Sequence, residues 1–237
     1  MLKIFKNLDD LSRAAAQEFL ATANEAISAR GQFLVALNGG GTPKRLFELL
    51  ASTPDKMDWS RAHVFWGDER LVPVSESQNN YAMAKQTLLD RVPIPAENIH
   101  RVNTDLDPAE AVADYIRTLE RFATSPLRWP RFDLVLLGMG DDGHTASLFP
   151  GSPVEESVPV VAVTADYQGR PANRITLTPP VFNSAHKILF LVSGASKADA
   201  LRHVLNGDSE VQFPAVRIHP TTGTVQWFVD EAAAGQL

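Results

Sequence analysis

The sequence predicts an α/β fold in which a mostly parallel β-sheet is covered by helices on both faces. Short, continuously apolar runs alternate along the chain with longer amphipathic segments. Strands that are apolar along their whole length are typical of parallel sheets, which are buried on both faces. No Pro- or Ser-rich linker, repeat or low-complexity stretch divides the 237 residues. We therefore expect a single domain over residues 1–237, in which the irregular stretch 150–175 is a candidate for a small accessory lobe.

The elements of the first half follow from helix signals and apolar runs. Residues 8 to 29 place apolar side chains on one stripe and are followed by Gly31, which predicts a helix. Asp107, Pro108 and Glu110 form a helix-start signature. The expected elements are a helix at 8–29, a strand at 33–37, a helix from Pro43 to Leu50, a strand at 63–66, a charged turn at 67–70, a helix at 79–92, a strand at 98–102 and a helix at 107–122.

The second half contains more strands than helices. Residues 132–140 form a continuous apolar run, and residues 187–194 form another that leads into an amphipathic segment. The expected elements are strands at 132–140, 158–163, 174–178 and 187–194, a helix at 196–205 and a strand at 224–230.

Composition narrows the class of protein. Hydrophobic residues make up 44% of the chain and charged residues 21%, as in ordinary globular proteins. The absence of cysteine excludes disulfides, thiolate catalysis and cysteine-ligated metals, and favours a reducing compartment. The N-terminus lacks a signal-peptide core, and no apolar stretch approaches the roughly 20 residues that cross a bilayer. We expect a cytoplasmic protein without a membrane partner.

The formal net charge is −6, and no basic run stands out. Nucleic-acid binding usually needs a basic face, so nucleic acid is not an expected partner. An anionic ligand would have to be attracted by a few local cations and backbone dipoles.

Residues 38–43, NGGGTP, lie between a predicted strand and a predicted helix. Gly39, Gly40 and Gly41 would leave backbone amides bare at the helix N-terminus, beside the hydroxyl of Thr42, and such a place suits a phosphate or another anion. The spacing fits neither the GxGxxG nor the P-loop pattern. The alternative is a tight turn without a ligand.

A second glycine-rich turn, 138–143, contains Asp142 and is followed by His144. Histidine exchanges protons near neutral pH, and a neighbouring carboxylate can fix its tautomer. The pair is therefore a candidate acid/base group. The alternative is a surface histidine in a turn, and metal ligation is less supported because no second histidine lies at helical spacing.

Ligands of parallel α/β sheets bind beyond the carboxyl ends of the strands, which directs attention to residues 38–43, 67–72, 138–147 and 193–197. Arg70 could clamp an oxyanion, although a surface salt bridge is as common. Lys197 is expected in the first turn of a helix, where a cation opposes the helix dipole. A ligand would account for that lysine.

Five segments resemble the glucosamine-6-phosphate isomerase/6-phosphogluconolactonase family. In chain order they are NGGGTP, VFWGDERLVPVSESQNNYAMA, FDLVLLGMGDDGHTASLFPGSP, RITLTPP and LFLVSGASKADAL, and the resemblance covers roughly residues 30 to 230. Deaminases of this family read GHIAFNEPG and DEY where this chain reads GHTASLFPG and DER, with Phe149 in place of the glutamate. Both departures favour the lactonase branch.

The resemblance implies a Rossmann-like sheet of the deaminase/lactonase type. It implies hydrolysis of 6-phosphoglucono-1,5-lactone to 6-phosphogluconate, the second step of the oxidative pentose phosphate pathway, with no metal and no organic cofactor. By position it implies that the substrate is held by Gly39, Gly40, Gly41, Thr42, Arg70 and Lys197, with Arg174 as a further candidate. It implies that His144 is the general acid/base, with Asp142 beside it. The expected partner is a small sugar phosphate, and the chain is expected to be a monomer or homodimer.

The residue types are suited to lactone hydrolysis even without the resemblance. A lactone carbonyl is already electrophilic, so one base, worth about 10²–10⁴-fold, is enough. The segment TASLF lacks the G-x-S-x-G elbow of serine hydrolases. Backbone amides of the turn 140–143 are candidate donors to the oxyanion.

Two alternatives stay open. The first is another sugar-phosphate enzyme on the same scaffold, a deaminase or isomerase, which an assay for ammonia release would reveal. The second is a non-catalytic sugar-phosphate sensor. Sensors of this fold usually carry a DNA-binding helix pair, and the first predicted helix already begins near residue 8.

Overall fold

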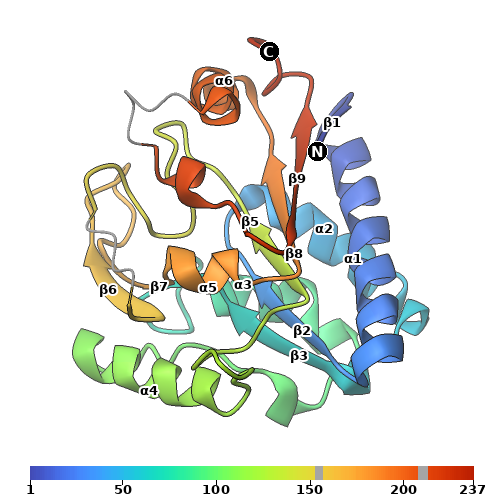
Figure 1. The fold of residues 1–237 in the computed structure, drawn as a ribbon, viewed down its shortest axis with the longest axis vertical. Helices are drawn as coiled ribbons and strands as arrows, with labels where there is room; N and C mark the ends of the chain where they lie inside the picture. Colours follow the sequence, from blue (N-terminus) through green and yellow to red (C-terminus); the bar gives the residue numbers. More distant parts are fainter. Residues whose placement is uncertain (153–156, 208–212) are drawn as a thin grey trace.

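The computed structural model describes residues 1–152, 157–207 and 213–237, and its larger sheet confirms the predicted α/β fold. Six strands pair in the order β1–β9–β8–β5–β2–β3, and every neighbouring pair is parallel. They are β1 (Leu2–Phe5), β2 (Phe33–Leu37), β3 (Ala62–Trp66), β5 (Leu134–Leu137), β8 (Lys187–Val192) and β9 (Thr224–Asp230). Figure 1 shows this sheet in the middle of the molecule.

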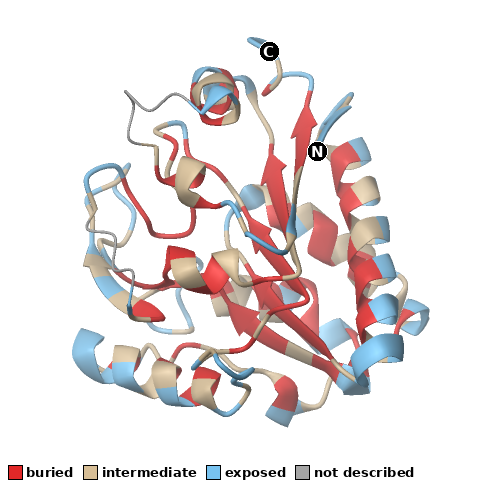
Figure 2. Cartoon of the chain, in the orientation of Figure 1, coloured by how far each residue is buried: buried red, intermediate tan, exposed pale blue. Residues whose placement is uncertain are grey.

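Helices cover both faces of this sheet. They are α1 (Leu8–Arg30), α2 (Gly41–Ala51), α3 (Asn80–Thr87), α4 (Pro108–Glu120), α5 (Pro179–Asn183) and α6 (Ala198–Asn206). Because side chains of a strand alternate between the faces, Val35 of β2 belongs to the core shared with α1, α2 and α3. Its neighbour Leu34 belongs to the core shared with α4, α5 and α6. Buried residues accordingly fill the central strands, while the outer faces of the helices are exposed (Figure 2).

A smaller sheet stands beside the main one and has the order β4–β7–β6. It consists of β4 (Asp68–Arg70), β6 (Val160–Thr164) and β7 (Asn173–Leu177), which pair antiparallel. The expectation of a turn at 67–70 is wrong, because these residues pair with β7 from a distant part of the chain. Strands do form near 158–163 and 174–178, although outside the parallel sheet. Within the expected lobe 150–175, residues 153–156 lie outside the described part of the chain.

Other element boundaries differ from the predictions. No strand forms at 98–102, where Ile99 makes only an isolated bridge to Val64. The helix expected at 79–92 is shorter: α3 ends at Thr87, and the 3₁₀ turn Leu89–Arg91 leads to Pro93. Lys197 is the last residue of the 3₁₀ turn Ala195–Lys197 and the N-cap of α6, rather than a residue inside the first turn of that helix. Strand β1 and helix α5 were not anticipated.

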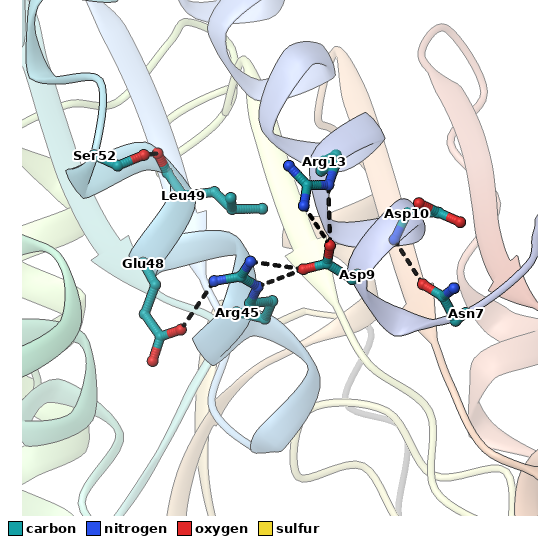
Figure 3. A network of polar contacts seen from close by, with 8 residues as sticks. All are labelled: Asn7, Asp9, Asp10, Arg13, Arg45, Glu48, Leu49 and Ser52. Atoms are coloured by element: carbon teal, nitrogen blue, oxygen red, sulfur yellow. Dashed lines mark hydrogen bonds and ion pairs between the residues drawn. The ribbon is translucent and has the colours of Figure 1, made fainter.

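Helix α2, which follows the glycine loop, is fastened to α1 by Asp9 (Figure 3). Asp9 lies in the first turn of α1 and accepts hydrogen bonds from Arg45 of α2 at 2.7 Å and from Arg13 at 2.6 Å. The hydrogen bonds from Arg45 and Arg13 hold the pKa of Asp9 below its ordinary value although desolvation opposes them. This contact is exposed, so it aligns the two helices more than it stabilises the fold.

The strand order creates a crevice between β2 and β5. From β2 the chain moves outward to β3, whereas β5 lies on the opposite side of β2 and leads to β8 and β9. The connections that leave β2 and β5 therefore diverge. Ligands of open α/β sheets bind in such a crevice. Within the described residues, no helix is long and apolar enough to span a membrane.

Candidate active site

A cavity of about 190 Å³ opens at the carboxyl ends of β2, β5 and β8. All four predicted strand exits contribute to its wall, and so does the β6–β7 hairpin. The lining residues are Asn38 to Pro43, Asp68, Arg70, Gly138 to Gly140, His144, Ala146, Tyr167, Arg170, Arg174, Leu191, Ser193 and Lys197. The structure thus brings together Gly39, Gly40, Gly41, Thr42, Arg70, Arg174, Lys197 and His144, and Asp142 lies directly behind His144.

The imidazole of His144 is fixed by Asp142. Its Nδ1 lies 2.6 Å from Asp142 Oδ1, and its backbone N–H donates to the same oxygen at 3.1 Å. Burial acts to raise the pKa of Asp142, but the hydrogen bond from the ring, the charge of His144 and the backbone donors outweigh it and lower the pKa. An ionised Asp142 favours the tautomer in which Nδ1 carries the proton. Nε2 then has its lone pair available, and no described residue hydrogen-bonds to it.

Gly140 makes room for this pair. A Cβ at this position would lie 2.1 Å from His144 Nδ1 and 2.5 Å from Asp142 Oδ1. Two aromatic side chains hold the other surfaces of the ring: Phe149 stacks on it at 4.7 Å between centroids, and Tyr167 meets it edge-on at 4.6 Å. The His144 side chain is only 15% exposed. The ring is therefore held in one orientation by contacts on several sides.

The glycine loop presents free amides to the cavity, as the sequence predicts. Gly40 has a φ of 100°, and no side chain caps the N-terminus of α2. The N–H groups at the start of a helix have no partner within the helix, so those next to Thr42 remain available to an anion. Gly39 donates its N–H to Asn38 Oδ1 at 2.9 Å, which shapes the loop.

A buried carboxyl behind the loop holds α3 in place. Glu69 accepts N–H bonds from Arg70, Asn80 and Tyr81 at 2.7 to 2.8 Å. Burial raises the pKa of Glu69 to about 7 against these three bonds. The Asn80 side chain donates to the Asp68 carbonyl at 2.9 Å and presses on Gly39, where a Cβ would lie 1.7 Å from Asn80 Oδ1. Asn80 thereby fixes the position of the glycine loop.

Arg70 and Arg174 face one another across the small sheet, as direct neighbours of β4 and β7. Like charges directly opposite in an antiparallel pair destabilise it. Arg174 is 2% exposed and lies over the ring of Phe149, yet its Nε and Nη2 find no partner among the described residues. Burial lowers the pKa of Arg174, the charge of Asp68 opposes this, and the charge of Arg70 lowers the pKa further. Donors this costly to bury fit an anionic ligand in the cavity.

The exit of β8 supplies Ser193 and Lys197. The loop is held by buried Asp230 of β9, which accepts from the Ser193 hydroxyl and, at 3.1 Å, from the Gly194 N–H. Within the described residues, the ammonium of Lys197 forms no ion pair, so its charge is available to the cavity.

Sequence reasoning missed several lining residues. Asp68 is buried against the Ser147 hydroxyl at 2.7 Å, and Tyr167 and Arg170 come from the β6–β7 hairpin. From the sequence alone Asp68 belongs to an expected charged turn, and no local pattern predicts that the hairpin lies beside the β5 exit. Its position follows from the pairing of β7 with β4, a contact between residues more than a hundred positions apart.

Comparisons with known proteins identify the family. The family of glucosamine-6-phosphate isomerases and 6-phosphogluconolactonases matches residues 6–227. A 6-phosphogluconolactonase from a Nostoc species is 42% identical over 92% of this chain and 90% of its own length. One from Mycobacterium tuberculosis is 36% identical over 100% of this chain and 98% of its own. The crystal structure of 6-phosphogluconolactonase from Thermotoga maritima superposes with a TM-score of 0.85, at 29% identity over 97% of this chain and 99% of that one.

The fold and the cavity define an α/β protein with a hydrogen-bonded His–Asp pair and several cationic side chains at a topological switch point. The chain belongs to the glucosamine-6-phosphate isomerase/6-phosphogluconolactonase family.

Proposed function

We propose that this chain is a lactonase that hydrolyses 6-phospho-D-glucono-1,5-lactone to 6-phospho-D-gluconate, in the oxidative pentose phosphate pathway. The observation that carries the proposal is the His144–Asp142 pair, 2.6 Å apart, at the wall of a cavity that also holds Arg70, Arg174 and Lys197. An acid/base group next to cations that form no ion pair with any described residue suits a substrate that combines a lactone with a phosphate. The full-length similarity to 6-phosphogluconolactonases supports the same reaction.

In the proposed mechanism His144 acts first as a base. Asp142 keeps the proton on Nδ1, so Nε2 accepts a proton from a water molecule as its oxygen attacks the lactone carbonyl carbon. The tetrahedral oxyanion then collapses, and the bond between that carbon and the ring oxygen breaks. The imidazolium returns its proton to the departing ring oxygen. Water is the only co-reactant, and the product is a hydroxy acid.

The oxyanion contacts proposed from the sequence need correction. The N–H of Gly140 donates to the His144 carbonyl at 2.8 Å, and the N–H of Gly143 donates to the Gly140 carbonyl at 3.2 Å. These two amides hold the turn together and are not available to substrate. We assign the oxyanion instead to donors that line the cavity and have no such partner among the described residues, the amides next to Thr42 and the Nε–H of Arg70, whose Nη1 donates to the Gln78 carbonyl at 2.7 Å.

We propose that the substrate is held by Gly39 to Thr42, Arg70, Lys197 and Arg174. The free amides at the start of α2 and the unpaired nitrogens of Arg174 support phosphate binding. We further propose that the chain works as one domain with a small β6–β7 lobe, as a cytoplasmic monomer or homodimer, without nucleic acid, metal or organic cofactor. Activity should therefore survive treatment with a chelator.

A direct assay tests the function. Purified protein is offered the phosphorylated lactone, with acid release corrected for spontaneous opening, and separately glucosamine 6-phosphate, with ammonia release measured. We expect acid release only, and we expect His144→Ala to fold normally while losing most of its kcat. Ammonia release without lactone hydrolysis would identify a deaminase. Near-wild-type turnover of His144→Ala would remove His144 from the mechanism.

A further inference from the structure

The tip of the β6–β7 hairpin is a tight turn at residues 167–170. The Arg170 N–H donates to the Tyr167 carbonyl at 3.0 Å, and Ala165 pairs with Ala172 at 3.0 Å. Both central residues have positive φ, 51° for Gln168 and 64° for Gly169. Positive φ at both central residues is typical of a type I′ turn, whose twist matches that of the flanking strands. A glutamine in the first central position of this turn is strained. Some contact must therefore hold the tip in this form.

Asp141 provides that contact. Its Oδ1 accepts the Tyr167 hydroxyl at 2.5 Å, and its Oδ2 accepts the Gln168 side-chain amide at 3.1 Å. The hydrogen bond from Tyr167 lowers the pKa of Asp141, burial opposes it, and the charge of Lys197 lowers the pKa further. Both carboxylate oxygens of a residue in the catalytic turn are thus bonded to the hairpin tip. Asp141 and Asp142 are adjacent in sequence but point to different partners.

The fastened tip brings Arg170 to the mouth of the cavity. Arg170 lines both the main cavity and an adjoining one of about 290 Å³, and the two cavities also share Gly40 and Arg70. Its guanidinium lies 5.8 Å from the centre of the Tyr167 ring. Across the described residues it forms no ion pair and its side chain donates no hydrogen bond. Its charge also acts on Arg174, whose pKa it lowers after the larger effects of burial, Asp68 and Arg70.

Three guanidinium groups therefore gather at one wall of the cavity, with Asp68 as the carboxylate that acts on Arg174. Such a gathering of like charge costs folding free energy, and a doubly charged anion between the groups would offset that cost. We propose that Arg170 is a further substrate-binding residue that contacts the phosphate, and that Asp141 and Tyr167 are positioning residues that deliver it. This inference rests on the proposed function, because it names a contact to the substrate of that reaction.

Steady-state kinetics test the contact. For Arg170→Ala we expect the KM for the phosphorylated lactone to rise about tenfold, with kcat changed less than about twofold. Hydrolysis of unphosphorylated gluconolactone should be unchanged, and Arg170→Lys should recover part of the loss. The matched control is Arg128→Ala, an exposed arginine that lines neither cavity. An unchanged KM, or an equal rise for both lactones, would overturn the phosphate contact.

A double-mutant cycle tests the positioning. Tyr167→Phe keeps the ring that packs on His144 and removes only the hydroxyl bonded to Asp141. We expect this variant to raise the KM for the phosphorylated lactone about threefold, and to add nothing in the Arg170→Ala background. If Tyr167→Phe instead caused a general structural defect, its effect on KM would add to that of Arg170→Ala. Additive effects on KM would therefore overturn the positioning role.

Calorimetric titration with inorganic phosphate separates this inference from the proposed function. We expect the wild type to bind phosphate more tightly than Arg170→Ala, by a factor similar to the change in KM. If the wild type failed to hydrolyse the lactone, the proposed function would fall, and the phosphate titrations would still decide the role of Arg170. Equal affinities in wild type and Arg170→Ala would overturn it.

Discussion

The orientation of a single imidazole ring depends on one carboxylate and one missing Cβ. Asp142 determines which nitrogen of His144 carries the proton, and Gly140 leaves the space that this contact needs. The chemistry proposed for Nε2 therefore depends on the residues that hold the other side of the ring, at Nδ1.

Replacing Asp142 by Asn should separate orientation from charge. The amide can donate a hydrogen bond to Nδ1, which favours the tautomer with the proton on Nε2 and removes the base. We expect kcat to fall by about 10²–10⁴-fold with a smaller change in KM. The check is the kinetics of Asp142→Asn beside Asp55→Asn, an exposed aspartate remote from the cavity. A kcat within twofold of wild type would show that the tautomer does not matter.

Gly39 and Gly41 offer a matched pair of substitutions. A Cβ on Gly39 would collide with the Asn80 side chain at 1.7 Å, whereas one on Gly41 meets nothing within 4 Å. Because Asn80 is buried and hydrogen-bonded to Asp68, it cannot move aside freely. We expect Gly39→Ala to lower the free energy of unfolding by about 1–3 kcal/mol, and Gly41→Ala to leave it unchanged or raise it slightly. Denaturant melts would reveal the difference, and equal stabilities would refute the steric argument.

The short strand β4 links the parallel sheet to the small antiparallel sheet. It follows β3 of the parallel sheet and pairs with β7 of the small one, which places Arg70 opposite Arg174. The pairing thus puts two cations where packing alone would favour neutral residues.

Arg174→Met should expose the conflict between stability and binding. Methionine fills a similar volume against Phe149, removes the unpartnered guanidinium nitrogens and relieves repulsion with Arg70. We expect the free energy of unfolding to rise by about 1–3 kcal/mol while the KM for the phosphorylated lactone rises at least tenfold. Arg91→Met, at an exposed position, is the control. A less stable Arg174→Met protein would mean that contacts within the fold already offset the cost of burying the guanidinium, and would contradict the argument.

The parallel sheet was predictable because most of its strands are short apolar runs, which can be recognised without knowing the strands they pair with. Helix boundaries were predictable where capping residues mark them, as Asp107 and Gly31 do. The small sheet was not, because GDER reads as a polar turn until β7 pairs with it. His144, Asp142 and the glycine loop could be recognised from local pattern. Tyr167 and Arg170 could not, since only the folded hairpin brings them to the cavity.

For the whole molecule, acid stability should depend on a histidine pair at the edge strand β3. His63 Nδ1 lies 3.2 Å from His100 Nε2, and both rings contact Phe122. Burial lowers the pKa of His63. Burial, followed by the charges of His63 and Arg121, lowers the pKa of His100 to about 4. The unfolded chain, with histidine pKa values near 6.5, then binds protons that the folded chain does not.

The free energy of unfolding should therefore fall as the pH drops from about 6.5 to about 4. Below about 4 the histidines are protonated in both states, and their contribution no longer changes with pH. The slope for one histidine is at most about 1.4 kcal/mol per pH unit, and smaller here because both rings are partly solvated. Denaturant melts between pH 7.5 and 4.5 should show a flatter dependence for the double variant His63→Phe/His100→Phe. His219→Gln, at an exposed position, should keep the wild-type slope. Parallel curves for wild type and the double variant would contradict the assignment.

The cavity draws its wall from residues 38 to 197, and its two halves belong to different sheets. An anion that bridges the glycine loop and Arg174 would act as a non-covalent cross-link between those sheets. Because opening either sheet would destroy the site, the anion binds only the folded protein. Its binding free energy then adds to the free energy of unfolding of the whole molecule. At a ligand concentration of 100 Kd this linkage amounts to about 2.7 kcal/mol. The metabolite pool in the cell would thus set part of the lifetime of the folded protein against proteolysis.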